Sequence, residues 1–406
     1  MVGTTNGATG PLAGVTVIEC AQVVAGPTCG YMLADLGADV IKVERAPMGD
    51  DVRRMTPPSI EGESAAFMML NRNKRAIALD LKQAAAKDAF LRLVRTADVL
   101  VENYRPGAME RMGLGYDDLR AENPALVYAT ISGFGRTGPY AGRGGYDLVA
   151  QAMSGLMSIT GEGPGRPPVK VGSPIADFAA GILAALGIVS AYSHRLKTGE
   201  GQYLETSLFE AAISATFHQT AMFLATGDPP PPLGSAHPLA APYQAYETAD
   251  GWITVGAGND ANWPRLAKAL GAPELTEDER FLTNDDRMDN LDALNEALAP
   301  LFRAQDTDGL LAALEELGVP AGPVLDIGQM TEDPQTLARD MIMEVEHGRL
   351  GPVRTLGPPV KLAGTPANVR RGAPVLGEHS AEILGEYGYD GDEIAAMAKT
   401  GAVILA

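Results

Sequence analysis

The sequence predicts an α/β fold with a large Rossmann-like domain and a smaller α+β domain. Short apolar segments alternate with helical segments from residue 15 to residue 131, which is typical of a parallel sheet covered by helices. Four prolines at 229–232 can continue neither a helix nor a sheet, and so indicate a linker. Beyond them, Asp250-Gly251 lies between two extended segments, a pattern that favours a β-hairpin.

The first strand–helix–strand unit opens with an apolar strand at Val15–Glu19. Pro27 stands where a first helical residue is favoured, and this helix is expected to end at Gly37. The next strand follows at Val40–Val43. Further strands are predicted at 76–81, 99–102, 126–131 and 202–206. Helices are predicted at 84–96 and 208–225, and two more are expected: one that ends at 122, and one that begins just after 177 and ends near 197. This succession predicts a doubly wound sheet.

The pattern also gives domain boundaries. We expect the large α/β domain at 1–225, a linker at 226–241 and the small α+β domain at 242–344, with 345–406 returning to the large domain. The small domain is predicted to hold a hairpin of 242–247 and 252–255, helices within 262–317 and an extended segment at 318–324. In the last stretch a helix is predicted to begin near His379-Ser380.

The composition argues against several kinds of protein. A formal net charge of −19 opposes a nucleic-acid partner. Cys20 and Cys29 suggest buried thiols in a reducing, cytoplasmic setting, and the five scattered histidines lack the spacing of a metal site. The longest apolar stretch, Phe178–Tyr192, falls short of the roughly 20 residues that cross a bilayer. The first ten residues contain neither a basic residue nor an apolar block, so we expect a disordered tail rather than a targeting signal.

Nucleotide-binding motifs are weak. Glu44 stands where an acidic residue would bind a ribose hydroxyl, but only Gly26 and Gly30 remain of a G-x-G-x-x-G pattern. The glycine-rich run 161–165 contains Pro164 and lacks the Lys-Ser/Thr of a P-loop. The sequence therefore supports neither a nicotinamide enzyme nor an ATP-dependent ligase.

Three features leave alternatives open. A basic cluster is either a solvated face or a site for a phosphate-rich ligand at the strand ends. Asp177 before an apolar helix is either an N-cap or a functional carboxylate, and Tyr146-Asp147 after two glycines could equally be turn residues. The basic cluster consists of Lys42, Arg45, Arg53, Arg54, Arg72, Lys74 and Arg75, followed by Arg105 and Arg111.

Seven motifs in this order resemble family III CoA-transferases, typified by formyl-CoA and carnitine-CoA transferases. The resemblance runs from about Leu12 to the C-terminus. The motifs are Ala25-Gly26-Pro27, the stretch Gly37–Glu44, Asn71-Arg72-Asn73-Lys74-Arg75, the stretch Val101–Gly107, Tyr146-Asp147, Ala176-Asp177 and the stretch Lys197–Gln202.

The resemblance implies a role for each matching residue. Asp177 would be the covalent nucleophile, with Tyr146 and Asp147 beside the thioester. CoA would be a substrate, with no tightly bound cofactor and no metal, and the chain would form a ring threaded through a second copy in a homodimer. The CoA contacts implied are Arg45 and Arg111 at the phosphates, and Val24, Leu79, Asp80, Leu81, Lys82, Asn103, Tyr104 and Arg105 along the molecule; Gly234, Ser235 and His237 would form a loop over the substrate.

Departures from the pattern indicate the substrate. Val24 replaces the glutamine of formyl-CoA transferase, and Gly234–His237 replaces its glycine-rich loop, so we expect neither formate nor oxalate as substrate. The stretch 234–259 is more similar to the branch that uses succinyl-CoA and dicarboxylic acids. An α-methylacyl-CoA racemase of the same fold would need a histidine at Tyr146 and an acid at Asn259. A noncatalytic CoA-binding protein is the alternative from a different functional class.

Overall fold

The computed structural model describes residues 9–406, so residues 1–8 of the predicted tail lie outside the described part. The chain divides into two compact units. The first unit runs to Leu156 and includes Lys170–Ala221 and Pro334–Ala406, while the second contains Met157–Val169 and Met222–Asp333. The predicted boundaries at 225 and 344 therefore differ from those of the structure. Residues 157–169 join the second unit because this segment bonds there, for example through the Gly234 amide and the Gly161 carbonyl (2.7 Å).

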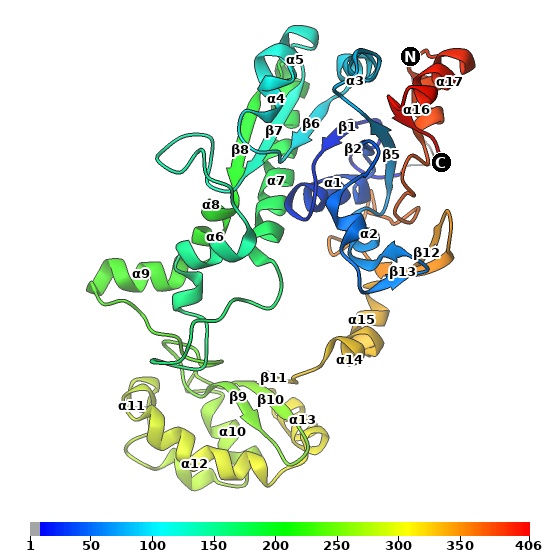
Figure 1. The fold of residues 1–406 in the computed structure, drawn as a ribbon. Helices are drawn as coiled ribbons and strands as arrows, with labels where there is room; N and C mark the ends of the chain where they lie inside the picture. Colours follow the sequence, from blue (N-terminus) through cyan, green and yellow to red (C-terminus); the bar gives the residue numbers. More distant parts are fainter. Residues whose placement is uncertain (1–8) are drawn as a thin grey trace. The chain divides into compact units, whose positions relative to one another are not determined.

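A seven-stranded sheet forms the centre of the first unit. Its order is β14-β5-β2-β1-β6-β7-β8, with the strands parallel except β14. Figure 1 shows this succession from β5 to β8. The strand order reverses between β1 and β6, where ligands bind in doubly wound sheets. The strands are β1 Thr16–Cys20, β2 Asp39–Arg45, β5 Lys74–Leu79, β6 Val99–Glu102, β7 Val127–Ser132, β8 Tyr203–Ser207 and β14 Val403–Ile404.

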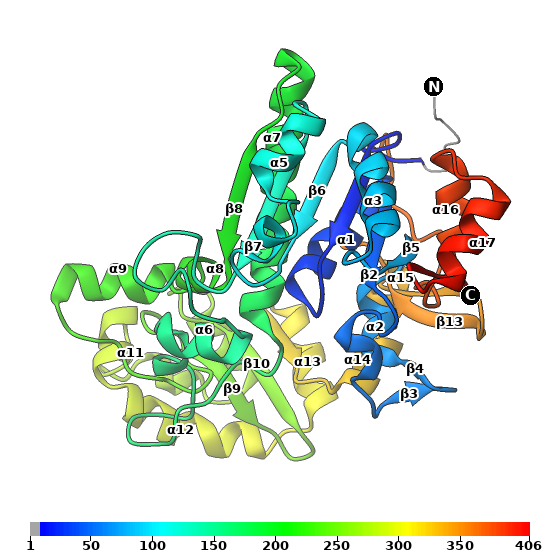
Figure 2. The ribbon, with the colours of Figure 1, turned by 45° about the horizontal axis from the view of Figure 1, so that its top comes forward.

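Helices cover both faces of this sheet. One core cluster joins β1, β2, β6 and β7 to α1 (Ala25–Asp35) and α7 (Ile175–Thr198). The other face packs on α3 (Ala84–Thr96), α5 (Tyr116–Glu122), α16 (Ser380–Glu386) and α17 (Gly391–Lys399). Figures 1 and 2 both show α16 beside β5, and α17 contacts α16 and β14. The C-terminal segment thus completes the first unit, because its apolar residues fill the second face.

Smaller elements complete the first unit. Cys20 and Cys29 are free and buried in it, as the sequence suggested. The predicted helix at 208–225 is two helices, because the Thr216 hydroxyl and amide both bond to the Ile213 carbonyl and interrupt the ladder. The elements are α2 Ala65–Leu70, α4 Ala108–Arg111, α6 Asp147–Met153, α8 Leu208–Ser214, α9 Phe217–Thr226 (which crosses the boundary), α15 Pro334–Ala338, β3 Ser59–Ile60, β4 Glu63–Ser64, β12 Ile342–His347 and β13 Gly351–Leu356.

Helix α7 is longer than the apolar stretch that the sequence indicated. It has 24 residues and, by length and composition alone, is the one described helix that could cross a membrane. The helix gains this length because it continues through His194–Thr198 to a left-handed Gly199. One side of α7 is part of the core of the first unit, and a core helix has the same composition.

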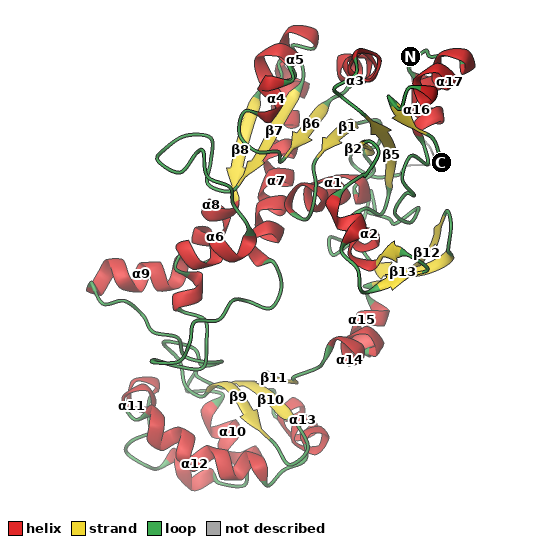
Figure 3. Ribbon diagram, viewed as in Figure 1, coloured by secondary structure: helices red, strands yellow, loops and turns green. Residues whose placement is uncertain are grey.

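The second unit contains a three-stranded antiparallel sheet of order β11-β10-β9. The predicted hairpin is present as β9 (Tyr243–Glu247) and β10 (Trp252–Gly256), with β11 at Ala321–Pro323. Figure 3 distinguishes these strands from the helices of the unit. The helices are α10 Trp263–Ala269, α11 Asn284–Asp289, α12 Leu291–Arg303, α13 Thr307–Glu316 and α14 Ile327–Glu332.

Candidate active site

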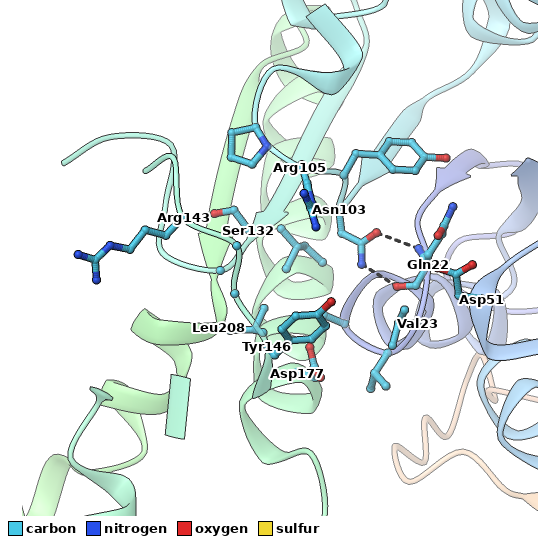
Figure 4. A pocket seen from close by; sticks show the side chains of 18 residues that line it. Gln22, Val23, Asp51, Asn103, Arg105, Ser132, Arg143, Tyr146, Asp177 and Leu208 are labelled. Atoms are coloured by element: carbon cyan, nitrogen blue, oxygen red, sulfur yellow. Dashed lines mark hydrogen bonds between the residues drawn. The ribbon is translucent and has the colours of Figure 1, made fainter. Parts of the chain in front are cut away.

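A cavity of about 320 Å³ lies at the carboxyl ends of β1, β6 and β7 in the first unit. It therefore occupies the point where the strand order reverses. Figure 4 shows Asp177, Tyr146 and Asn103 among the side chains around it. The lining comprises Gln22, Val23, Val24, Ala25, Asp51, Asn103, Tyr104, Arg105, Pro106, Ile131, Ser132, Gly133, Arg143, Gly144, Gly145, Tyr146, Asp177 and Leu208.

Asp177 lies in the first turn of α7, not at its N-cap. The N-cap is Pro174, so the interpretation of Asp177 as a capping residue is wrong. Burial, followed by the negative charge of Asp147, raises the pKa of Asp177 to about 7. A large fraction of this carboxyl group is therefore ionised near neutral pH, and its anion is poorly solvated.

Asp147, the first residue of α6, holds the start of α7 through hydrogen bonds. Its Oδ1 accepts from the amide of Ala176 (2.8 Å) and at longer range from that of Asp177 (3.4 Å). Two carboxyl groups that are 30 residues apart in the sequence are thereby brought together at one helix start.

Gln151 extends this network and was missed in the sequence. It is fully buried; its Nε2 donates to Asp147 Oδ2 (2.7 Å) and its Oε1 accepts from the Val171 amide (2.9 Å). The spacing of four residues between Asp147 and Gln151 on one helix face was the available signal. Tyr146 precedes Asp147 as the N-cap of α6, and its side chain lines the cavity while remaining largely exposed.

The CoA contacts implied by the resemblance fall into two groups. Val24, Asn103, Tyr104 and Arg105 line the cavity. Arg45 and the segment Leu79–Lys82 do not line it. They lie at the carboxyl ends of the adjacent strands β2 and β5, where Arg45 is paired with Leu79 in register. Arg111, which also lies outside the lining, ends the short helix α4 after β6.

Most of the basic cluster is unavailable to a ligand. Lys42 and Lys74 are buried in ion pairs with Glu19 (2.9 and 2.7 Å). Arg53, Arg72 and Arg75 are bound to Glu44, Asp35 and Asp39 respectively. Arg45, which is 3.5 Å from Asp51, is more exposed, and so are Arg105 and Arg111. Five of the nine residues are thus held by carboxylates within the first unit, and a phosphate could contact only the exposed members of the cluster.

The predicted substrate loop belongs to the second unit. The Ser235 hydroxyl accepts from the Ala245 amide (3.0 Å), and the His237 ring packs on Tyr243 with 5.1 Å between ring centroids. Asn259 lies in the same unit, where its side-chain oxygen accepts from the amides of Ala261 and Asn262. Asn259 is therefore a turn residue, and it lacks the acidic group that a racemase needs there.

Comparisons with known proteins show what this chain is similar to. Residues 12–380 match the sequence profile of CoA-transferase family III. A succinate–glutarate CoA-transferase of Agrobacterium fabrum is 42% identical over 93% of this chain and 95% of its own length. An acetyl-CoA:oxalate CoA-transferase of Acetobacter aceti is 40% identical over 93% of this chain and 96% of its own. A CAIB/BAIF family protein of Brucella suis superposes with a TM-score of 0.85 at 41% identity, covering 93% of this chain and all of the other.

Proposed function

Because this chain belongs to CoA-transferase family III and is a CoA-transferase, we propose that it transfers CoA between carboxylic acids through covalent intermediates on Asp177. The observation that carries this proposal is the Asp177 carboxyl group in the cavity, whose pKa burial and Asp147 raise to about 7. An aspartate held in this way is a stronger nucleophile than a fully solvated one.

The proposed reaction conserves the thioester. An Asp177 oxygen attacks the thioester carbonyl carbon of the donor. The C–S bond breaks, CoA departs as the thiolate, and an acyl-aspartyl anhydride is formed. The thiolate then attacks the Asp177 carbonyl carbon, which releases the donor carboxylate and forms an aspartyl-CoA thioester. The acceptor carboxylate repeats the two steps in reverse order and restores Asp177. No ATP is required, because one thioester replaces another.

The carboxyl edge of the sheet supports a binding track for CoA. The ends of β5, β2, β1 and β6 lie side by side in this order, so the segments after them form one continuous edge. We infer that CoA extends from the cavity across this edge, with its phosphates near Arg45 and Arg111. Charge-assisted bonds from guanidinium groups suit phosphates.

Arg45→Ala and Arg111→Ala are each expected to weaken CoA binding by about 1 to 3 kcal/mol, because each would remove a charge-assisted phosphate contact. Titration calorimetry with CoA and with CoA lacking its 3′-phosphate measures the loss of affinity. If the replaced arginine contacts the 3′-phosphate, the loss should be smaller for the ligand that lacks this phosphate. Arg95→Ala is the matched control, because Arg95 is an exposed arginine paired with Glu122 (2.9 Å) at the end of α3. Parent affinity in both test variants would exclude these residues from the phosphate site.

We infer that the donor and acceptor are dicarboxylic acids or their CoA thioesters. The relative named for succinate and glutarate supports this inference, and Arg105 in the cavity lining supplies positive charge for a second carboxylate.

Mass-spectrometric exchange tests this substrate class. Succinyl-CoA with glutarate should form glutaryl-CoA at least about 100-fold faster than with butyrate, because removing one carboxylate removes one charge-assisted contact. Oxalate belongs in the panel, since the sequence predicts that it is a poor acceptor. Equal rates for mono- and dicarboxylic acids would contradict the inference and leave CoA transfer itself intact.

We also propose a cytoplasmic homodimer of interlocked ring-shaped chains. An apolar stripe along α7, formed by Phe178, Ile182, Leu183, Leu186 and Val189, is exposed in the single chain. The spacing of these residues places them on one helix face, and an exposed apolar face of this kind suits a protein interface. Sedimentation at micromolar concentration would contradict the dimer if it found only monomer.

A further inference from the structure

Three side chains from outside the β1–α1 loop (residues 21–24) bond to its backbone. Lys42 donates to the Ala21 carbonyl (2.9 Å). Asn103 Oδ1 accepts from the Gln22 amide (2.8 Å), and Asn103 Nδ2 donates to the Gln22 carbonyl (2.7 Å), as Figure 4 shows. Asp50 accepts from the Val23 amide (3.1 Å). We call Lys42, Asp50 and Asn103 the loop clamp.

Two members of the loop clamp belong to a buried ionic network. Lys42 is 2.9 Å from both Glu19 and Asp50, and Glu19 also binds Lys74 at 2.7 Å. These four side chains are at most 1% exposed. Burial would raise the pKa of Asp50, but Lys42 and the amides of Val52 and Val23 hold it below its usual value. Well-packed apolar residues are often as stable as buried ion pairs, so stability alone does not account for this network.

Val23 has an unusual backbone conformation. Its φ of +67° lies in the left-handed region, which disfavours a β-branched residue most strongly. The loop has little room to relax, since a Cβ on Gly26 would come within 2.1 Å of the Ala21 Cβ. Val23 and Val24 both line the cavity that holds Asp177. Strain of this kind persists only where the surroundings impose it, and it is concentrated at functional sites.

We propose that Asn103 is a positioning residue that, together with Asp50 and Lys42, holds Val23 in its left-handed conformation and so sets the Val23–Val24 wall of the cavity. In this role the Asn103 side chain acts on Gln22 and not on CoA. Both its amide oxygen and its amide nitrogen are engaged with Gln22. The inference rests on the proposed function, because it takes this cavity as the site of CoA transfer.

A double-mutant cycle between Asn103 and Val23 tests the proposal. Asn103→Ala is expected to lower kcat/KM by about 100-fold, since a small displacement of a site wall has effects of that size. Val23→Gly should lower it by less than about tenfold, because glycine adopts the left-handed conformation without strain. In the Val23→Gly background, Asn103→Ala should lower kcat/KM by less than about fivefold. Equal losses in both backgrounds would show that Asn103 acts on CoA directly and would overturn the proposal.

Hydrogen exchange gives a readout that does not depend on activity. In Asn103→Ala the amides of Gln22 and Val23 should exchange faster, while the amides of β1 keep their protection. If Asn103→Ala does not fold, Asn103→Asp replaces it, because aspartate still accepts from the Gln22 amide but cannot donate to the carbonyl. Unchanged exchange at residues 22 and 23 in a folded variant would overturn the proposal.

Asn123→Ala is the matched control for the loss of an asparagine clamp. Asn123 donates to the carbonyls of Val94 and Ala97 (2.9 and 2.8 Å) and accepts from the Ala125 amide, just before β7 at the opposite sheet edge. This variant should lower Tm and leave kcat/KM within about twofold of the parent. Full CoA-transfer activity in Asp177→Asn would instead refute the proposed function, whatever the outcome of the double-mutant cycle.

Discussion

Asp177→Asn is expected to reduce CoA exchange by about 10⁴-fold or more, since removal of a covalent nucleophile has effects of this order. Asparagine retains the size of the side chain but provides no anionic oxygen to attack a thioester. CoA affinity should stay near that of the parent, because the residues proposed at the phosphates are unchanged. Asp177→Ala should lose activity to a similar extent.

Trapping identifies the attacked residue. During turnover the parent should gain the mass of an acyl or CoA adduct on the peptide that contains Asp177, and hydroxylamine should release or replace it. Asp147 is the carboxylate to compare, since it bonds to the Ala176 amide at 2.8 Å. An adduct on Asp147, or near-parent exchange in Asp177→Asn, would remove Asp177 from the nucleophile role.

The Asp177→Asn variant should be more stable to unfolding than the parent above neutral pH. The pKa of Asp177 is raised from 3.8 to about 7 by burial and by Asp147, so the folded protein retains a proton that the unfolded chain has lost between these values. Folding stability therefore falls as pH rises through this window, and the loss is complete above pH 7. Asparagine does not titrate, so Asp177→Asn should gain about 1 to 3 kcal/mol at pH 8 and little at pH 4. Tm measured at both values checks this difference.

The order of elements could be predicted from the sequence because it depends on local patterns. The β1–α1–β2 unit and α3 follow from apolar periodicity and from Pro27, and most predicted strand ends lie within two residues of those observed. The short strand β14 was missed, because two residues, Val403 and Ile404, carry no periodic signal. The place of residues 157–169 in the second unit was also missed, since it depends on a bond to Gly234.

Motifs of single residues led to several side chains of the candidate site, whereas contacts between residues far apart in the sequence were missed. Asp177, Tyr146 and Val24 line one cavity, as their motifs suggested. Lys74 was assigned to a possible ligand surface because its partner Glu19 is 55 positions away and belongs to another strand. The proposed role of Asn103 in holding Gln22 likewise depends on the pairing of β1 with β6. Local sequence does not contain these pairings.

Asp147→Ala is expected to lower kcat by about 100- to 1,000-fold, because the start of α7 loses the acceptor that fixes it and Asp177 is misplaced. Asp147→Asn keeps an oxygen that accepts from the Ala176 amide, so its loss should be smaller, about tenfold. Rates of CoA exchange at saturating substrate, measured in samples quenched at fixed times, give kcat for both variants.

The pH dependence separates the charge of Asp147 from its position. Burial is the larger cause of the raised pKa of Asp177 and the charge of Asp147 the second, so Asp147→Asn should lower that pKa only partly. The nucleophile is then ionised at lower pH, and the acid limb of kcat/KM should move below its parent midpoint near pH 7. Profiles between pH 5 and 9 show the shift.

Gln151→Leu is the matched control, because it removes the bond to Asp147 Oδ2 (2.7 Å) but leaves the negative charge in place. Its kcat should fall by about tenfold, since Asp147 is held less firmly, while the midpoint stays near pH 7. If Asp147→Asn left the midpoint unchanged, or Gln151→Leu shifted it as far as Asp147→Asn does, the charge of Asp147 would have no part in setting the ionisation of the nucleophile.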